Sequence, residues 1–376
     1  MICTVIQFVI TFLFNTTAMT IQAYERFVFI RLCLIIACVL QPCINLLLLY
    51  HGGNVVTISV ATLVISFLTY VVYYCYAKKV LDLKYKFDNF DKNLFKNIFV
   101  FSAFLFLNTI TDQLTFSTDN IILGIFSGSI MVAIYSVGSN FKNYFMAFST
   151  SASSVFAPKI NKIIAESGSD DETNEIFIRI GRIQFYIVTL ILLGYIFLGR
   201  QFVYLWVGNE YSDAYWIGLL LMISVYVPCF QNIGLEIQKA KNMHKARSVV
   251  YFLIAIVNII ITIPLSLLYG GIGASFATCL CMFIGTVIFM NIYNYKKVGI
   301  DIPAFWKSIF RILPGMIIPI VYGVFINCFI NINSYWNLLF VILGFVLVYF
   351  LSCWFFSMNH YEKDIFSKPL KRFLKK

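Results

Sequence analysis

Ionised side chains are scarce in this chain. Only 12% of its 376 residues are Asp, Glu, Lys or Arg, about half the share of a typical soluble domain. None of the four occurs from Leu32 to Ala77, from Ser248 to Tyr295 or from Ile312 to Tyr361, stretches of 46, 48 and 50 residues. This composition excludes an ordinary water-exposed surface, and the 60% apolar content excludes intrinsic disorder.

Catalytic and metal-binding signatures are also absent from the sequence. It contains no Walker loop, HExxH, GxSxG or CxxC pair, and its three histidines lie far apart. The 10 cysteines are scattered through apolar runs, which indicates no disulfide framework. We therefore expect no enzyme activity, no cofactor and no metal site. The net charge of +11 does not indicate nucleic-acid binding, because the basic loops of a membrane protein account for it.

Long apolar runs are present instead, and each charge-free stretch is long enough for two membrane-spanning helices and a short turn. Continuous runs, without the alternation of a β-barrel, predict an all-α, polytopic transmembrane helical bundle. We expect eleven spans, at residues 2–14, 28–50, 55–77, 94–125, 129–157, 184–206, 214–238, 247–269, 272–294, 307–329 and 335–357. The first is short, and it lacks the cationic start and cleavage site of a signal peptide.

Basic residues alternate strictly between the connections of these spans. Of the 28 Lys and Arg residues, 26 fall in one set of connections, Arg200 falls in the other, and Lys142 lies within a span. Basic loops of membrane proteins remain in the cytoplasm. We therefore predict a multi-pass protein of the cytoplasmic (inner) membrane with a cytoplasmic C-terminus.

Polar residues inside one span form the first candidate site, because charges at membrane depth are costly and usually functional. Asn108, Asp112 and Asp119 are spaced by four, seven and eleven residues, which places them on one helical face. This face should border a water-filled cavity or a partner helix. Asp119 has no basic residue at its predicted depth, so it either couples transport to a cation or proton or lies at a helix end wetted from outside.

The next span adds Tyr135, Asn140 and Lys142. Lys142 and Asp112 each lie about 11–13 residues from the external end, so both reach the midplane on adjacent antiparallel helices. We predict that the two pair or share water. Two interpretations remain open: a structural pair that neutralises two buried charges, or a substrate- or ion-contacting group in a central cavity.

Several short motifs follow one another in a characteristic order. They are A-Y-E-R-F at 23–27, T-D-N-I-I-L-G at 118–124, Y-S at 135–136, Pro158, G-N-E-Y at 208–211 and G-G-I-G-A at 270–274. With these motifs the chain resembles the polysaccharide and oligosaccharide flippases of the multidrug/oligosaccharidyl-lipid/polysaccharide exporter superfamily. The resemblance covers most of the chain. It implies two helical lobes around a central cavity that opens alternately to each side of the membrane.

The resemblance also implies a division of the chain. Residues 1–77 would be the remainder of an N-terminal lobe, since the chain would begin near the fourth helix of the family and the first lobe would be incomplete. The other parts would be a cytoplasmic linker (78–93), a C-terminal lobe (94–306), an extra transmembrane hairpin (307–357) and a basic cytoplasmic tail (358–376).

The cargo of this family is a polyprenyl-diphosphate-linked oligosaccharide, which is flipped for surface polysaccharide such as O-antigen or capsule. The implied partners are membrane lipid, this lipid-linked glycan and other polysaccharide-assembly membrane proteins. The cavity candidates are Asn108, Asp112, Asp119, Tyr135, Asn140 and Lys142. At the cytoplasmic entrance, Arg26, Arg31, Arg179 and Arg182 either attract the diphosphate or only anchor the topology. The alternatives are a cation-coupled multidrug exporter of the same superfamily and a membrane glycan polymerase or ligase, which would need an external catalytic loop.

Overall fold

The computed structural model describes residues 2–24, 26–82, 92–96, 98–99, 102, 106, 113, 117–154, 170–241, 243, 245–330 and 332–364. Residue contacts divide the chain into two units, Met1–Lys96 and Asn97–Lys376, which are described separately. All regular structure among the described residues is helical, which confirms the predicted all-α class.

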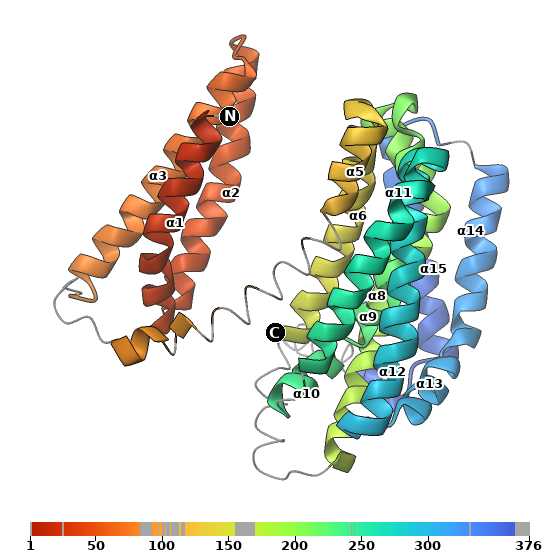
Figure 1. Ribbon diagram of the computed structural model, residues 1–376. Helices are drawn as coiled ribbons and strands as arrows, with labels where there is room; N and C mark the ends of the chain where they lie inside the picture. Colours follow the sequence, from red (N-terminus) through yellow and green to blue (C-terminus); the bar gives the residue numbers. More distant parts are fainter. Residues whose placement is uncertain are drawn as a thin grey trace, which may run out of the picture. The chain divides into compact units, whose positions relative to one another are not determined.

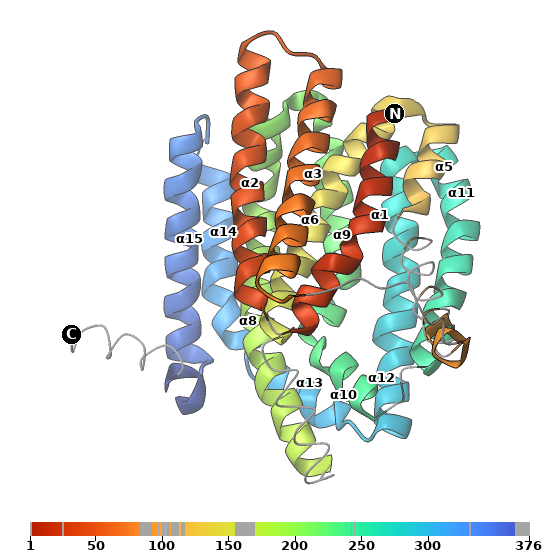
Figure 2. The ribbon, with the colours of Figure 1, turned by 90° about the vertical axis from the view of Figure 1, so that its left-hand side faces the viewer.

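Unit 1 contains three long helices, α1 (Ile2–Ala23), α2 (Phe27–Tyr50) and α3 (Val55–Lys79), drawn in red and orange in Figures 1 and 2. Both α1 and α2 pack on α3, and Ile21, Ile30 and Tyr73 are buried among them. Most other apolar side chains of α2 point outward and are exposed, as expected for helices in lipid.

The first helix differs from its prediction. Its expected end at residue 14 is wrong, because α1 continues to Ala23. The hydroxyls of Thr16 and Thr20 donate to backbone carbonyls one turn earlier, at 3.2 and 2.8 Å. Polar residues whose hydrogen bonds are satisfied within the helix do not end it, even in an apolar environment.

Unit 2 holds the other labelled helices (Figure 1). They are α5 (Thr118–Phe126), α6 (Gly128–Ser154), α8 (Asp170–Val207), α9 (Asp213–Phe230), α10 (Ile233–Ala240), α11 (Lys245–Met282), α12 (Met290–Tyr293), α13 (Ile302–Phe310), α14 (Ile317–Phe329) and α15 (Tyr335–Phe356). The π-helical segments Phe283–Phe289 and Asn294–Val298 flank α12. The long helices alternate in direction. We call the end that carries Lys239, Lys241, Lys296 and Lys297 the basic end, and the opposite one the non-basic end.

A sharp break in α11 brings two spans together. Gly270 has φ +57 and ψ −136, a conformation that glycine adopts readily and other residues avoid. The chain therefore turns back at the non-basic end, and the halves of α11 before and after Gly270 lie antiparallel (Figure 1). This is the turn that the Tyr269-Gly270-Gly271 sequence predicts between spans 247–269 and 272–294.

Seven helical stretches in the described part are long and apolar enough to cross a membrane, and eight if the bent pair Ile302–Phe310 and Leu313–Phe329 is one span. Three differences separate this count from the expected eleven spans. The stretch Val249–Val298 counts once although it breaks at Gly270, α6 is too polar to qualify, and most of 94–117 lies outside the described residues.

Candidate functional site

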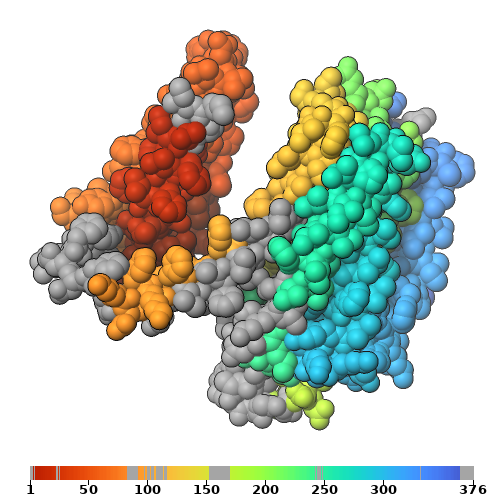
Figure 3. All heavy atoms as spheres, viewed as in Figure 1, coloured from red at the N-terminus to blue at the C-terminus, as the bar shows by residue number. Residues whose placement is uncertain are grey.

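A buried carboxylate lies where α5, α6 and α11 meet. Asp119, in the first turn of α5, is only 1% exposed. Its Oδ2 accepts a hydrogen bond from the Tyr135 hydroxyl on α6 and another, at 2.9 Å, from the Thr278 hydroxyl on the second half of α11. In Figures 1 and 3, α5 and α11 lie side by side along this contact. The sequence predicted Asp119 and Tyr135 as site residues, and the structure brings them together.

The carboxylate lies at membrane depth. Tyr135 follows the turn at Gly128 by seven residues and Thr278 follows Gly270 by eight. At 1.5 Å per helical residue, both are about 10–12 Å from the non-basic end. Because the hydrocarbon core of a bilayer is about 30 Å thick, the carboxylate is within it.

Asn258 and Thr262 extend the polar cluster on the first half of α11. Their spacing of four places them on one helical face, and both are fully buried. The Thr262 hydroxyl donates to Asn258 Oδ1 at 3.2 Å, and the Asn258 amide donates to the Thr278 hydroxyl oxygen, also at 3.2 Å. The break at Gly270 is what makes these two halves of α11 face each other across the cluster.

Lys142 supplies a positive charge to this cluster. It follows Tyr135 by two helical turns on the buried face of α6, is 3% exposed, and interacts electrostatically with Asp119. The structure shows no ion pair between the two side chains among its described contacts, so the expectation that Asp119 lacks a basic partner at its depth stays a prediction.

The cluster has the chemistry to bind a proton or a hard monovalent cation. Asp119 Oδ1 is buried and has no hydrogen-bond partner among the described residues. An unmatched buried acceptor of this kind is destabilising by about 1–3 kcal/mol. A single carboxylate with neutral hydroxyl and amide oxygens around it offers hard donors and only one negative charge. In the described part of the chain, no three His, Cys, Asp or Glu side chains gather as a metal site.

The opposite face of α6 is exposed and partly polar. Asn140, Asn143, Tyr144, Thr150 and Ser151 lie on this face at spacings of three, four, ten and eleven from the first. The Thr150 and Ser151 hydroxyls donate to carbonyls of their own helix, whereas the amide groups of Asn140 and Asn143 suit water or a polar partner better than lipid. These five residues, which we call the polar face of α6, include the predicted residue Asn140 and add Asn143, which the sequence analysis did not single out.

A partly open apolar groove of about 350 Å³ adjoins this face. Its walls come from α6, α8, α9 and α15, and it exposes only apolar surface. The lining residues are Phe141, Tyr144, Phe145, Phe148, Leu190, Ile191, Gly194, Tyr195, Leu198, Gly199, Phe202, Met222, Ile342, Phe345 and Val346. Tyr144 belongs both to the groove and to the polar face of α6, so an apolar and a polar surface meet at this residue.

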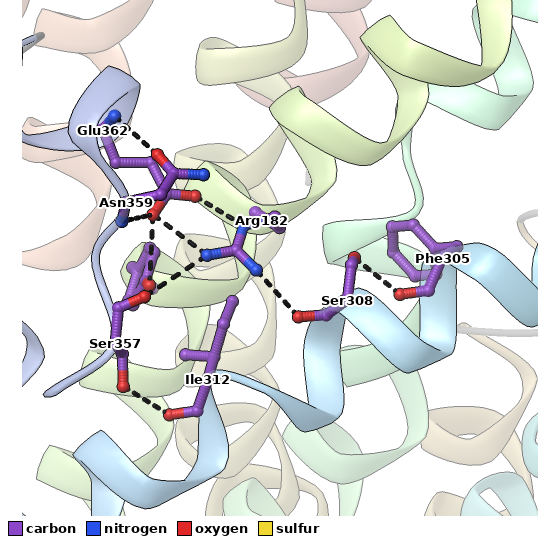
Figure 4. Close-up of polar contacts among 8 residues, drawn as sticks. Arg182, Phe305, Ser308, Ile312, Ser357, Asn359 and Glu362 are labelled. Atoms are coloured by element: carbon purple, nitrogen blue, oxygen red, sulfur yellow. Dashed lines mark hydrogen bonds and ion pairs between the residues drawn. The ribbon is translucent and has the colours of Figure 1, made fainter. Parts of the chain in front are cut away.

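The four predicted entrance arginines differ in their surroundings. In unit 1, Arg26 and Arg31 are exposed. In unit 2, Arg179 is exposed and pairs with Glu175 on its own helix. Arg182 is buried, and Glu362 binds its guanidinium, as Figure 4 shows. In this conformation Arg182 therefore does not present its charge to a substrate.

Two predicted cavity residues, Asn108 and Asp112, lie outside the described residues. The pairing of Asp112 with Lys142 thus stays a prediction. Sequence reasoning missed Asn258, Thr262 and Thr278 as members of the Asp119 cluster. The spacing of Asn258 and Thr262 within a charge-free stretch was the available signal, but hydroxyl and amide side chains also serve ordinary helix packing in membranes.

Together, the apolar spans and the charged and polar residues buried among them define a multi-pass helical membrane protein. A solved structure described as "Lipid II flippase MurJ, inward closed conformation" matches this chain with a TM-score of 0.69 at 18% identity, over 96% of this chain and 72% of the other. The family model described as "Polysaccharide biosynthesis protein" matches residues 2–215, more than half of the chain. The chain belongs to this polysaccharide biosynthesis protein family, which confirms the resemblance to the flippases. No curated protein matches the sequence.

Proposed function

We propose that this protein flips a polyprenyl-diphosphate-linked oligosaccharide across the cytoplasmic membrane for a surface polysaccharide such as O-antigen or capsule, without covalent chemistry. The observation that carries the proposal is the junction at Tyr144, where the apolar groove meets the polar face of α6. A lipid-linked glycan has the same division, with a long apolar chain joined to a polar head. We also propose that the basic end and the C-terminus are cytoplasmic.

The groove suits the prenyl chain because of its shape. Lipid tails are as apolar as the groove, so the hydrophobic effect does not favour transfer of the chain from the bilayer. Close van der Waals contact with rigid aromatic walls does favour it, and Phe141, Phe145, Phe202 and Phe345 supply such walls. We therefore infer that the groove orients the carrier lipid while the head moves along the polar face of α6.

Lys142 is the cation that we assign to the diphosphate. In this structure it is buried and interacts with Asp119. A proton or a monovalent cation on Asp119 would remove the negative charge that holds Lys142, and the ammonium group would then be available to a phosphate oxygen. Energy coupling at Asp119 on α5 would thus control substrate binding by Lys142 on α6.

A reconstitution experiment tests this function. The purified chain is placed in vesicles with a polyprenyl-diphosphate oligosaccharide, and a membrane-impermeant glycosidase reports how fast the glycan crosses. We expect transport by the wild type and a loss of about tenfold or more in Lys142→Gln, the effect of one charge-assisted contact. The control is Lys239→Gln, which removes an exposed lysine paired with Glu236 on its own helix. No glycan movement by the wild type, or unchanged transport in Lys142→Gln, would refute the proposal.

The Asp119 cluster also suits the alternative of a cation-coupled multidrug exporter. The same vesicles, loaded with a small organic cation, discriminate between the two functions. Cation efflux that requires Asp119, in vesicles that do not move glycan, would favour the exporter. Glycan transport with no cation efflux would favour the flippase. A polymerase or ligase would instead lengthen or transfer the glycan, which the product mass reveals.

A further inference from the structure

We propose that the Arg182–Glu362 ion pair is a positioning latch that holds α15 against α8 and thereby fits the apolar groove to its lipid chain. The inference rests on the proposed function, since it concerns how the groove recognises a prenyl carrier. Arg182 and Glu362 do not touch the groove. They act through the helices that form two of its walls, so they are positioning residues.

The latch joins segments that are far apart in the sequence (Figure 4). The Arg182 guanidinium binds both carboxylate oxygens of Glu362, with Nε to Oε1 at 2.5 Å and Nη2 to Oε2 at 3.0 Å. It also donates to the carbonyl of Ser308 at 2.8 Å and to that of Ser357 at 3.3 Å. One side chain of α8 thus fastens α13, the end of α15 and the turn that follows it.

The turn that carries Glu362 is itself well fixed. The backbone N–H of Asn359 donates to Glu362 Oε2, and that of Glu362 donates to Asn359 Oδ1, both at 2.9 Å. This reciprocal pairing begins the short helix at 360–364 in the manner of a capping box. The Arg179 guanidinium carbon lies over the Tyr361 ring, 5.0 Å from the ring centre. The Lys363 ammonium nitrogen lies 5.9 Å from the centre of the Trp354 ring. Glu362 is therefore presented to Arg182 in one orientation.

The latch lies between the groove and the basic end of α8 and α15. One turn from Arg182, the backbone carbonyl of Tyr186 accepts a hydrogen bond from the Tyr349 hydroxyl of α15 at 2.8 Å. The groove begins one further turn along each helix, at Leu190 of α8 and at Val346 of α15. The spacing of these two walls is consequently set by the contacts at the basic end.

At the non-basic end, the Tyr335 hydroxyl of α15 donates to the Leu205 carbonyl of α8 at 2.5 Å. The Gln201 amide of α8 also donates to Asn327 of the neighbouring helix α14, at 3.0 Å. Between the two ends, α8 and α15 contact each other through apolar side chains such as Phe197 and Phe345. Apolar contacts between membrane helices have little directional preference, whereas a bidentate ion pair fixes both distance and orientation.

The test uses two variants that weaken the contact between α15 and α8, one at the latch and one a helical turn away from it. Glu362→Gln keeps the shape of the side chain and removes its charge, while Tyr349→Phe removes one hydrogen bond and leaves no buried charge unpaired. Lys239→Gln is the matched control, because it removes an ion pair within α10 that fastens no second helix. Each protein is reconstituted in vesicles, and transport is measured with the same glycan on prenyl carriers of full and shortened length.

We expect Glu362→Gln to raise the apparent KM for the full-length carrier about fivefold or more and to reduce the preference for it over the short one, with kcat changed less. Tyr349→Phe should shift both quantities in the same direction by a smaller factor. Spin labels at Leu190→Cys and Val346→Cys should report a broader distance distribution in both variants. A general loss of folding would lower kcat for both carriers equally and would leave the chain-length preference unchanged.

The outcomes separate the latch from the proposed function. If the wild type moves no lipid-linked glycan, the proposed function is wrong, and the spin-label distances still decide whether the latch holds α15. If the wild type transports and Tyr349→Phe and Glu362→Gln keep its KM, chain-length preference and label distances, the latch proposal is wrong. Should Glu362→Gln fail to fold, Arg182→Lys, which keeps the charge but cannot bind both carboxylate oxygens in the same way, decides by the same criteria.

Discussion

Neutralising Asp119 should destabilise the protein mainly through Lys142. In Asp119→Asn the amide oxygen still accepts hydrogen bonds from Tyr135 and Thr278, so these two contacts change little. The attraction between the carboxylate and the buried Lys142 is lost. The two groups interact through space without forming a direct ion pair, so the loss should be smaller than the about 3–5 kcal/mol of a directly paired buried charge. We expect a loss of about 1–2 kcal/mol for Asp119→Asn and a similar loss for Lys142→Gln.

A double-mutant cycle isolates the interaction. In Asp119→Asn/Lys142→Gln no buried charge of the pair remains, so we expect the double variant to recover more than half of the single losses. Unfolding free energies come from titration of the purified protein in mixed micelles with a denaturing detergent, followed by tryptophan fluorescence. Additive single effects, with a coupling energy below about 0.5 kcal/mol, would show that Lys142 and Asp119 do not interact. Thr262→Val is a useful control, since it removes a hydroxyl of the same cluster without changing its charge.

Further predictions concern the backbone, the groove and the topology. Gly270→Ala forces a side chain into a positive-φ conformation beside Met131 and should lower the unfolding free energy by about 1–2 kcal/mol in the same micelle titration. Gly194→Ala, where the added carbon meets no atom within 4 Å, should not lower it. Gly194→Phe should fill the groove and slow glycan transport about tenfold while the unfolding free energy stays within about 1 kcal/mol of wild type; transport at the wild-type rate would show that the groove is not used. Glu210→Cys should react with an impermeant thiol reagent from outside the cell and Lys296→Cys only from inside, and the reverse pattern would overturn the proposed orientation.

Composition and turn residues were enough to predict the helical bundle. Charge-free stretches identify apolar spans regardless of tertiary packing, because the bilayer imposes the same demand on each span separately. Gly128 and Gly270 indicate turns for a local reason as well, because glycine adopts positive φ readily. In the structure both residues have positive φ at the non-basic end. The misplaced end of α1 shows the limit of this reasoning. Threonines 16 and 20 look like a polar break in the sequence, yet their hydroxyls are satisfied inside the helix.

Side-chain partners were harder to predict than helices. The sequence identified Asp119, Tyr135 and Lys142 as candidates, but residue counting along the helix axis did not show that Lys142 interacts with Asp119. Arg182 was predicted at the entrance because it is basic and close to a span end. Its partner Glu362 is 180 residues away, and only the packing of α15 on α8 brings the two together. Pairings of this kind depend on tertiary geometry, which no local pattern in the sequence encodes.

In the proposed function, the two faces of α6 would link energy coupling at Asp119 to movement of the glycan. Lys142 is buried on the same face of α6 as Tyr135, and Asn143, the next residue, lies on the exposed polar face. Because a helix moves as a rigid element, a rotation of α6 that withdraws Lys142 from Asp119 moves Asn140 and Asn143 by the same angle. Shifting a two-state equilibrium from 1:99 to 99:1 requires about 5.5 kcal/mol. A through-space interaction of about 1–2 kcal/mol would change the ratio of the two conformations about 5- to 30-fold, so a proton or cation at Asp119 would drive part of that shift and substrate binding would supply the rest.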